Sequence, residues 1–98
     1  MNDAFTAPAA GLHVVILDDE IDVRRAISRV LSQAGYQVTA AGTAAEALEV
    51  LAEGTARVLI TDLIMPRVSG TDLIRRVRQE HPAVAIVAIS GGGNYWHH

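Results

Sequence analysis

Cysteine and lysine are both absent from this chain of 98 residues. Without cysteine, disulfides, thiolate catalysis and zinc–thiolate sites are excluded. Long hydrophobic runs are absent too. No apolar stretch approaches the ~20 residues that span a bilayer, and the amino terminus has neither the basic start nor the apolar core of a signal peptide. We therefore expect no membrane association and a cytoplasmic location.

An excess of basic residues is also lacking, because the formal net charge is -3 at pH 7 and all eight basic residues are arginine. Proteins that bind nucleic acid usually carry a marked excess of positive charge. We therefore expect no nucleic-acid partner. Half of the residues are apolar, and a chain of this length suits a single small domain with one core.

The chain does contain a regular alternation of apolar runs and helical patterns. Strands are predicted at residues 13–17, 36–41, 57–62 and 83–89, and helices at residues 20–34, 43–53 and 69–81. Alternation of this kind is typical of the α/β class, in which right-handed crossovers build a parallel sheet. Thr43 and Ser69 have the side chains and positions of helix N-caps.

The apolar patterns also predict where each element lies. Residues 13–17 and 83–89 are uniformly apolar, as expected of interior strands covered on both faces, whereas residues 36–41 alternate and predict an edge strand. The first helix has one apolar face that is expected to meet the core, formed by Val23, Ile27, Val30, Leu31 and Ala34. Its three arginines are expected to form a solvated face.

The two ends of the chain are predicted to lie outside the domain. Residues 1–11 follow no period and are interpreted as a flexible leader, and residues 12–93 as a partial domain. Residues 94–98 are interpreted as a tail, whose two histidines suggest the start of a purification tag. Since strand 83–89 is expected to be interior and nothing after it reads as a covering strand, the chain looks cut short at its carboxyl end.

Carboxylates end two of the predicted strands. Asp18 and Asp19 directly follow the first strand, and Asp62 ends the third. In adjacent parallel strands these ends lie at the same edge of the sheet, where open α/β folds bind ligands, and Ser90 reaches that edge from the last strand. Three nearby carboxylates repel one another unless they stay hydrated or bind a hard cation, for which Mg²⁺ is the natural candidate. A carboxylate held beside such an ion can attack phosphorus and form an aspartyl phosphate.

Taken singly, these residues have plainer interpretations. An acidic pair at the start of a helix is favoured by the helix dipole, so Asp18 and Asp19 alone would indicate a helix start more strongly than a metal site. A serine after a strand is most often a turn residue. The coincidence of the acidic pair with Asp62 favours a metal-binding or reactive site over these plainer interpretations.

Over residues 12–93 the sequence resembles the receiver domains of two-component response regulators. The resemblance depends on Val15-Ile16-Leu17-Asp18-Asp19-Glu20, Ile60-Thr61-Asp62, Met65-Pro66, Gly70 and Ile89-Ser90-Gly91. It implies a flavodoxin-like, doubly wound parallel sheet, of which this chain carries the first four strands and first three helices and lacks the last strand and helices. It also implies a signalling domain that assists its own phosphorylation, rather than an enzyme.

The same resemblance implies a role for each residue of the site. Asp62 would be the phosphoacceptor, and Ser90 would contact the phosphoryl group and move toward it on activation. Mg²⁺ would be held by Asp62, by Asp19 directly, by Asp18 through water, and by the backbone carbonyl of Ile64. The phosphoryl donor would be a sensor histidine kinase or a phosphotransfer protein. The family places a kinase-docking surface on its first helix, so this resemblance offers an alternative to a solvated face for Arg24, Arg25 and Arg29.

The chain departs from the family pattern in two respects. The family has a lysine before its fifth strand that pairs with the phosphoryl group, and this chain has no lysine. The elements that carry the family's usual output surface are also missing. These departures favour an alternative, a non-switching interaction module that forms a homodimer through its exposed, incomplete edge. A magnesium-dependent phosphatase is a weaker alternative, because such enzymes have Asp-x-Asp after the first strand and Asp18-Asp19-Glu20 does not fit.

Overall fold

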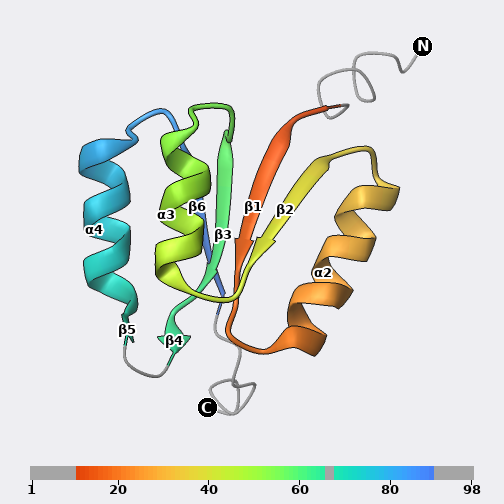
Figure 1. Ribbon diagram of the computed structural model, residues 1–98, viewed down its shortest axis with the longest axis horizontal. Helices are drawn as coiled ribbons and strands as arrows, with labels where there is room; N and C mark the ends of the chain where they lie inside the picture. The colour runs from red at the N-terminus through yellow and green to blue at the C-terminus, as the bar shows by residue number, and fades with distance from the viewer. Residues whose placement is uncertain (1–10, 66–67, 90–98) are drawn as a thin grey trace, which may run out of the picture.

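The computed structural model describes residues 11–65 and 68–89 and contains the predicted parallel sheet. Four strands pair in the order β2-β1-β3-β6 (Figure 1). They are β1 (His13–Leu17), β2 (Gln37–Ala41), β3 (Val58–Asp62) and β6 (Ala85–Ile89). Every neighbouring pair is parallel. The α/β class and the edge position of β2 were both predicted correctly.

Three helices cover the two faces of this sheet. Helix α2 (Ile21–Gln33) lies on one face, and α3 (Ala44–Ala52) and α4 (Gly70–Glu80) lie on the other (Figure 1). The main core is the layer between the sheet and the α3–α4 pair. Its buried members are Val15, Leu17, Ala41, Ala47, Leu51, Ala56, Leu59, Leu73 and Val77. This core holds β1 and β3 side by side at the centre of the sheet.

The helix ends follow the predicted local signals. The Thr43 hydroxyl accepts a hydrogen bond from the Glu46 N–H, and the Glu46 carboxylate accepts one from the Gly42 N–H, one residue before the N–H that a standard capping box would use. The Ser69 hydroxyl caps α4 by accepting a hydrogen bond from the Asp72 N–H. These caps fix the points at which the chain leaves a loop and enters each helix.

His13 anchors the amino end of β1. Its ring is buried, and its two nitrogens lie 2.9 Å from Thr55 Oγ1 and 2.8 Å from Thr39 Oγ1. Thr39 belongs to β2 and Thr55 follows α3. The side chain therefore ties together three segments at the edge of the sheet opposite the carboxyl ends of the strands.

Two predictions about burial were wrong. Strand β6 pairs with β3 alone in the part of the chain that the structure describes, so it is an edge strand there, and Val87 is 47% exposed. Helix α2 has no buried residue, and Val30 on its predicted core face is 64% exposed. A uniformly apolar pattern predicts which side chains favour burial. It does not predict whether other elements lie beside them and cover them.

Beyond the predicted elements, a short antiparallel pair follows β3. Strand β4 (Ile64–Met65) pairs with β5 (Val68–Ser69) in a segment that the sequence pattern assigned to a loop. Residues 1–10 of the predicted leader, Ser90 and the predicted tail at residues 94–98 lie outside the described residues. In the described ranges, no helix is long and apolar enough to cross a membrane.

Candidate functional site

Three aspartates meet at the carboxyl edge of the central strands. Asp18 and Asp19 follow β1, and Asp62 is the last residue of β3. One carboxylate oxygen from each lies within 4.8 Å of the others. Asp18 is 1% exposed and Asp62 is 5% exposed, whereas Asp19 is exposed to solvent. The structure therefore brings together the three carboxylates that the sequence placed at one edge of the sheet.

The register of the sheet accounts for this convergence. Leu17 of β1 lies beside Thr61 of β3, so the next residue of each strand reaches the same edge. The backbone N–H of Asp18 donates to the Ala41 carbonyl of β2, which extends the ladder by one residue. The first carboxylate of the cluster is thus held by the sheet itself and is not carried on a loose loop.

The two carboxylate oxygens of Asp18 have different surroundings. Oδ1 accepts a hydrogen bond from the Glu20 N–H at 2.9 Å. Oδ2 is buried and has no hydrogen-bond partner among the described residues. A buried carboxylate oxygen without a partner costs free energy, and such an atom is explained when a water or a cation fills the space in front of it.

Burial is the main influence on the ionisation of this carboxylate. It raises the pKa of Asp18 above its ordinary value, because loss of water disfavours the charged form. The Glu20 N–H lowers the same pKa, the negative charges of Asp62 and Asp19 raise it, and the positive charge of Arg24 lowers it. The net result is a raised pKa, so the charged site is destabilised by its own geometry.

Arg24 supports the site from α2, a role that the sequence did not indicate. Its guanidinium Nη1 donates to the backbone carbonyl of Asp18 at 2.8 Å. It also passes close to Gly42, where an added Cβ would lie only 2.8 Å from Nη1. We expected this arginine on a solvated helix face, and no sequence signal separates it from its neighbours, because the contact depends on how α2 is placed after β1.

Gly70 has a clear steric role beside Asp62. A Cβ added at this position would lie 2.6 Å from the carbonyl oxygen of Leu63 and 3.1 Å from its Cα. Only glycine therefore lets the start of α4 pack against the residue that follows Asp62. On the other side, the Leu63 N–H donates to the carbonyl of Ile89 in β6. The chain leaving Asp62 is thus fixed from two directions.

The donor set of this edge fits a hard divalent cation. All three side chains offer carboxylate oxygens, one buried oxygen has no partner in the described structure, and the cluster carries excess negative charge. Magnesium prefers oxygen ligands and is usually held by one or two carboxylates together with water. The backbone of Ile64, the fourth predicted ligand, follows the cluster in β4. Ser90 lies outside the described residues.

Comparison with known proteins agrees with the fold. The family model of the response regulator receiver domain matches residues 14–96. The chain is 36% identical over 78 residues to the response regulator receiver protein CpdR of Brucella abortus, covering 80% of this chain and 65% of CpdR. The chain thus spans a little less than two thirds of the length of that relative.

Two solved structures are similar as well. A response regulator receiver protein from Pseudomonas putida has 35% sequence identity and a TM-score of 0.76, with 83% of this chain and 69% of that chain covered. The response regulator TrrA of Thermotoga maritima, in complex with Mg²⁺ and BeF, has 25% identity and a TM-score of 0.77, with 87% and 74% covered. The chain therefore belongs to the response regulator receiver domain family.

Proposed function

We propose that this domain accepts a phosphoryl group on Asp62, in a magnesium-dependent step, from a phosphohistidine of a sensor histidine kinase or a phosphotransfer protein. The observation that carries the proposal is the cluster of three carboxylates within 4.8 Å, in which a buried oxygen of Asp18 has no partner in the described structure. Membership of the receiver family and the similarity to TrrA, which was solved with Mg²⁺ and BeF, support it.

The chemistry is a direct transfer between the two side chains. A carboxylate oxygen of Asp62 attacks the phosphorus and the bond from phosphorus to the histidine nitrogen breaks. The imidazole leaves in its neutral form because its other ring nitrogen carries a proton. An aspartyl phosphate remains on this chain. A bound magnesium ion would offset the negative charge of the transferring group. We assign its ligands to Asp18, Asp19, Asp62 and the backbone carbonyl of Ile64.

The other residues act by position. The hydrogen bond from Arg24 to the Asp18 carbonyl and the close packing of Gly70 on Leu63 hold the two acidic segments at one edge. Ser90 is proposed to donate its hydroxyl to a phosphoryl oxygen. A bound metal ion and backbone N–H groups would offset part of the remaining negative charge of the phosphoryl group. We propose that the reaction takes place in the cytoplasm.

Intact mass spectrometry tests this proposal. The folded protein is incubated with acetyl phosphate and MgCl₂, and we expect the mass to increase by one phosphoryl group. Asp62→Ala and chelation by EDTA should each abolish the gain. Asp72→Asn is the matched control, because Asp72 is an exposed aspartate on α4 that pairs with Arg75, and this variant should be labelled like the wild type. An unlabelled wild type that circular dichroism shows to be folded would exclude the proposal.

A second candidate function, homodimerisation, is favoured by the exposed apolar surface of β6 and α2. Val87 and Val30 are largely exposed, and a hollow of about 280 Å³ is lined by Ala26, Ile27, Val30, Leu31 and Ile60. Its lining comes from α2 and from Ile60 of β3. Among the described helices, α2 is the one that lies on this face of the sheet (Figure 1). We propose that a second copy pairs with the β6 edge and covers this face, because a strand edge that no described residue pairs with, next to apolar surface, favours association.

Sedimentation velocity over a range of protein concentrations tests this candidate. We expect a dimer whose dissociation constant rises at least about tenfold in Val87→Lys, because the charge would be placed on the exposed edge. Arg78→Lys, a charge-conserving change on the exposed face of α4, should leave the dimer unchanged. A monomer at all concentrations would exclude homodimerisation and would leave the phosphorylation result untouched.

A further inference from the structure

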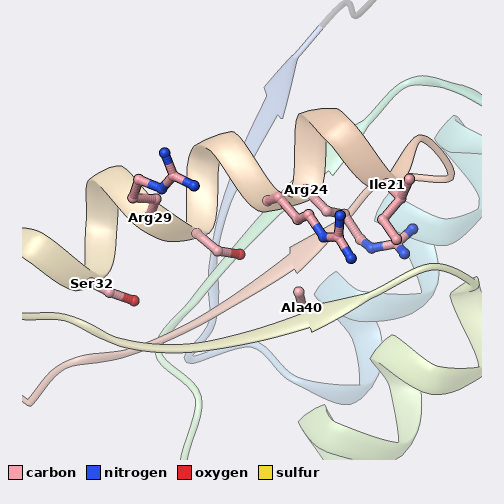
Figure 2. Close-up of a pocket in the computed structure, with 7 residues that line it drawn as sticks. Ile21, Arg24, Arg29, Ser32 and Ala40 are labelled. Carbon is pink, nitrogen blue, oxygen red and sulfur yellow. The ribbon is translucent and has the colours of Figure 1, made fainter.

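A second groove lies between α2 and the edge strand β2 (Figure 2), and it shares Arg24 with the acidic site. It has a volume of about 540 Å³. Its lining residues are Ile21, Arg24, Arg25, Ser28, Arg29, Ser32 and Ala40. Figure 2 shows Ser32 and Arg24 on the helix above the strand that carries Ala40. We call this the arginine–serine groove.

The arginine–serine groove concentrates positive charge in an acidic protein. Helix α2 carries three arginines and one aspartate, a formal net charge of +2, whereas the whole chain has a formal net charge of -3. Among the described residues, both ion pairs between side chains lie on α4. None of the three groove arginines takes part in one, and no carboxylate is among the described lining residues. Arg24 also acts on the charge of Asp18, so Arg25 and Arg29 are the groove arginines whose charge no described carboxylate pairs with.

Hydroxyl groups add to this surface. Ser28 and Ser32 are one helical turn apart and both line the groove. The Ser28 hydroxyl oxygen is buried and has no hydrogen-bond partner among the described residues. A buried hydroxyl without a partner is costly, and a bound ligand with acceptor oxygens would satisfy it. This observation is independent of the charge and favours the same class of ligand.

We propose that the arginine–serine groove binds a small organic phosphate of nucleotide size. Guanidinium groups bind phosphate oxygens in a bidentate manner, and serine hydroxyls are common additional donors. The volume falls in the range of roughly 300–1,000 Å³ that is typical of small-molecule sites. Ile21 and Ala40 supply apolar surface for the part of the ligand that carries no charge. The site is separate from Asp62, and the proposal does not depend on phosphorylation of that residue.

A nucleic acid fits these observations less well. Binding to a nucleic-acid backbone usually needs a basic stripe that follows several phosphates. Here the positive charge on α2 is confined to three arginines around one groove, in a chain that is acidic as a whole. An acidic peptide is also disfavoured, because a compact groove of this volume accommodates a small ligand and not an extended chain.

Isothermal titration calorimetry with ATP and pyrophosphate tests the proposal. The titrations are done in EDTA at 150 mM salt, so that neither metal at the acidic edge nor weak surface attraction contributes. We expect saturable binding of ATP at one site per chain, weaker binding of pyrophosphate, and no binding of adenosine. Asp62→Asn should bind ATP as the wild type does, which separates this site from the proposed phosphorylation site.

Two exposed arginines provide the decisive variants. Arg25→Gln and Arg29→Gln should each weaken ATP binding about tenfold or more, because each removes a charge-assisted contact. Both side chains are exposed, so the fold should be kept, and circular dichroism checks this. Arg78→Gln removes the same charge from the exposed face of α4 and should change the affinity less than about twofold.

Several outcomes would overturn the proposal. These are absence of saturable ATP binding at this salt concentration, equal weakening by Arg25→Gln and Arg78→Gln, or ATP binding that none of the α2 variants affects. Tight binding of an oligoglutamate peptide in the absence of ATP binding would also overturn it and would assign the groove to an acidic protein segment.

Discussion

Replacing Asp18 by asparagine should stabilise this protein when no metal is present. The Asp18 and Asp62 carboxylates are both buried, and their oxygens lie within 4.8 Å of each other. At this separation, Coulomb's law gives a repulsion of about 3.5 kcal/mol at an effective dielectric constant of about 20, and about 0.9 kcal/mol in water. Asparagine removes the charge but keeps an oxygen that can accept the Glu20 N–H. We therefore expect the free energy of unfolding to rise by about 1 to 3 kcal/mol.

Thermal and urea unfolding in EDTA at pH 7 measure this gain. For a domain of this size, 1 kcal/mol corresponds to a rise in Tm of about 4 to 8 °C. Glu49→Gln is the matched control, because Glu49 is exposed on α3 and its substitution changes the net charge by the same amount. This control should shift Tm by much less. If Asp18→Asn is neutral or destabilising in EDTA, the argument from repulsion and burial is refuted.

The same argument predicts how the gain depends on pH. Because the folded state raises the pKa of Asp18, the folded protein holds this proton at pH values where the unfolded chain has already lost it. The charge on Asp18 destabilises the folded protein fully at pH values above the pKa of Asp18 in the folded state. This destabilisation disappears as the pH falls below 3.8, the ordinary pKa of an aspartate. The stability difference between Asp18→Asn and the wild type should therefore shrink as the pH is lowered through this window. MgCl₂ at pH 7 should stabilise the wild type more than the variant, because the variant has lost one of the proposed ligands.

Three further predictions concern packing and hydrogen bonds. Gly70→Ala should lower the free energy of unfolding by about 1 to 3 kcal/mol, because its Cβ would lie 2.6 Å from the Leu63 carbonyl oxygen, and urea unfolding measures this loss; unchanged stability would show that α4 can shift freely. His13→Ala should cost about 2 to 4 kcal/mol in the same assay, through lost packing and two lost hydrogen bonds. His13→Gln should fall between the wild type and His13→Ala, and an equal loss in both variants would contradict a role for hydrogen bonding. Thr43→Ala should lower the free energy of unfolding by about 0.5 to 2 kcal/mol by removing the α3 cap. Unchanged helicity in circular dichroism together with an unchanged Tm would contradict this prediction.

The fold and the acidic cluster could be predicted because their signals are local and regular. Strand, helix and cap residues follow fixed periods, and the parallel order brings Asp18 and Asp62 together once β1 and β3 are neighbours. Exposure was harder to predict. The apolar pattern of β6 is the same whether or not another element covers it, and the exposure of Val87 and Val30 depends on which elements lie beside them.

The contacts of Arg24 and Gly70 show a second limit. Each depends on a distance between segments that are not adjacent in the chain, from α2 to Gly42 and from α4 to Leu63. The sequence marked Gly70 through a family resemblance, without the steric reason for it. No sequence feature predicted the role of Arg24, because a helical arginine that contacts a distant backbone carbonyl has the same sequence pattern as a solvent-exposed one. The two-residue strands β4 and β5 were missed because so short a pair has no period.

The hydrogen bonds of His13 have a consequence for how the sheet chooses its alignment. The four residues between His13 and Asp18 are all apolar and buried: Val14, Val15, Ile16 and Leu17. An alternation of polar and apolar side chains therefore cannot fix the pairing of strand β1. A slip of one residue would point every side chain to the opposite face. It would also remove the His13 ring from Thr39 and Thr55 and draw the Asp18 carboxylate into the sheet or away from Asp62. The polar residues at its two ends thus select one alignment for a strand whose middle would accept several, and the position of the acidic edge is determined in part by a histidine at the far end of the same strand.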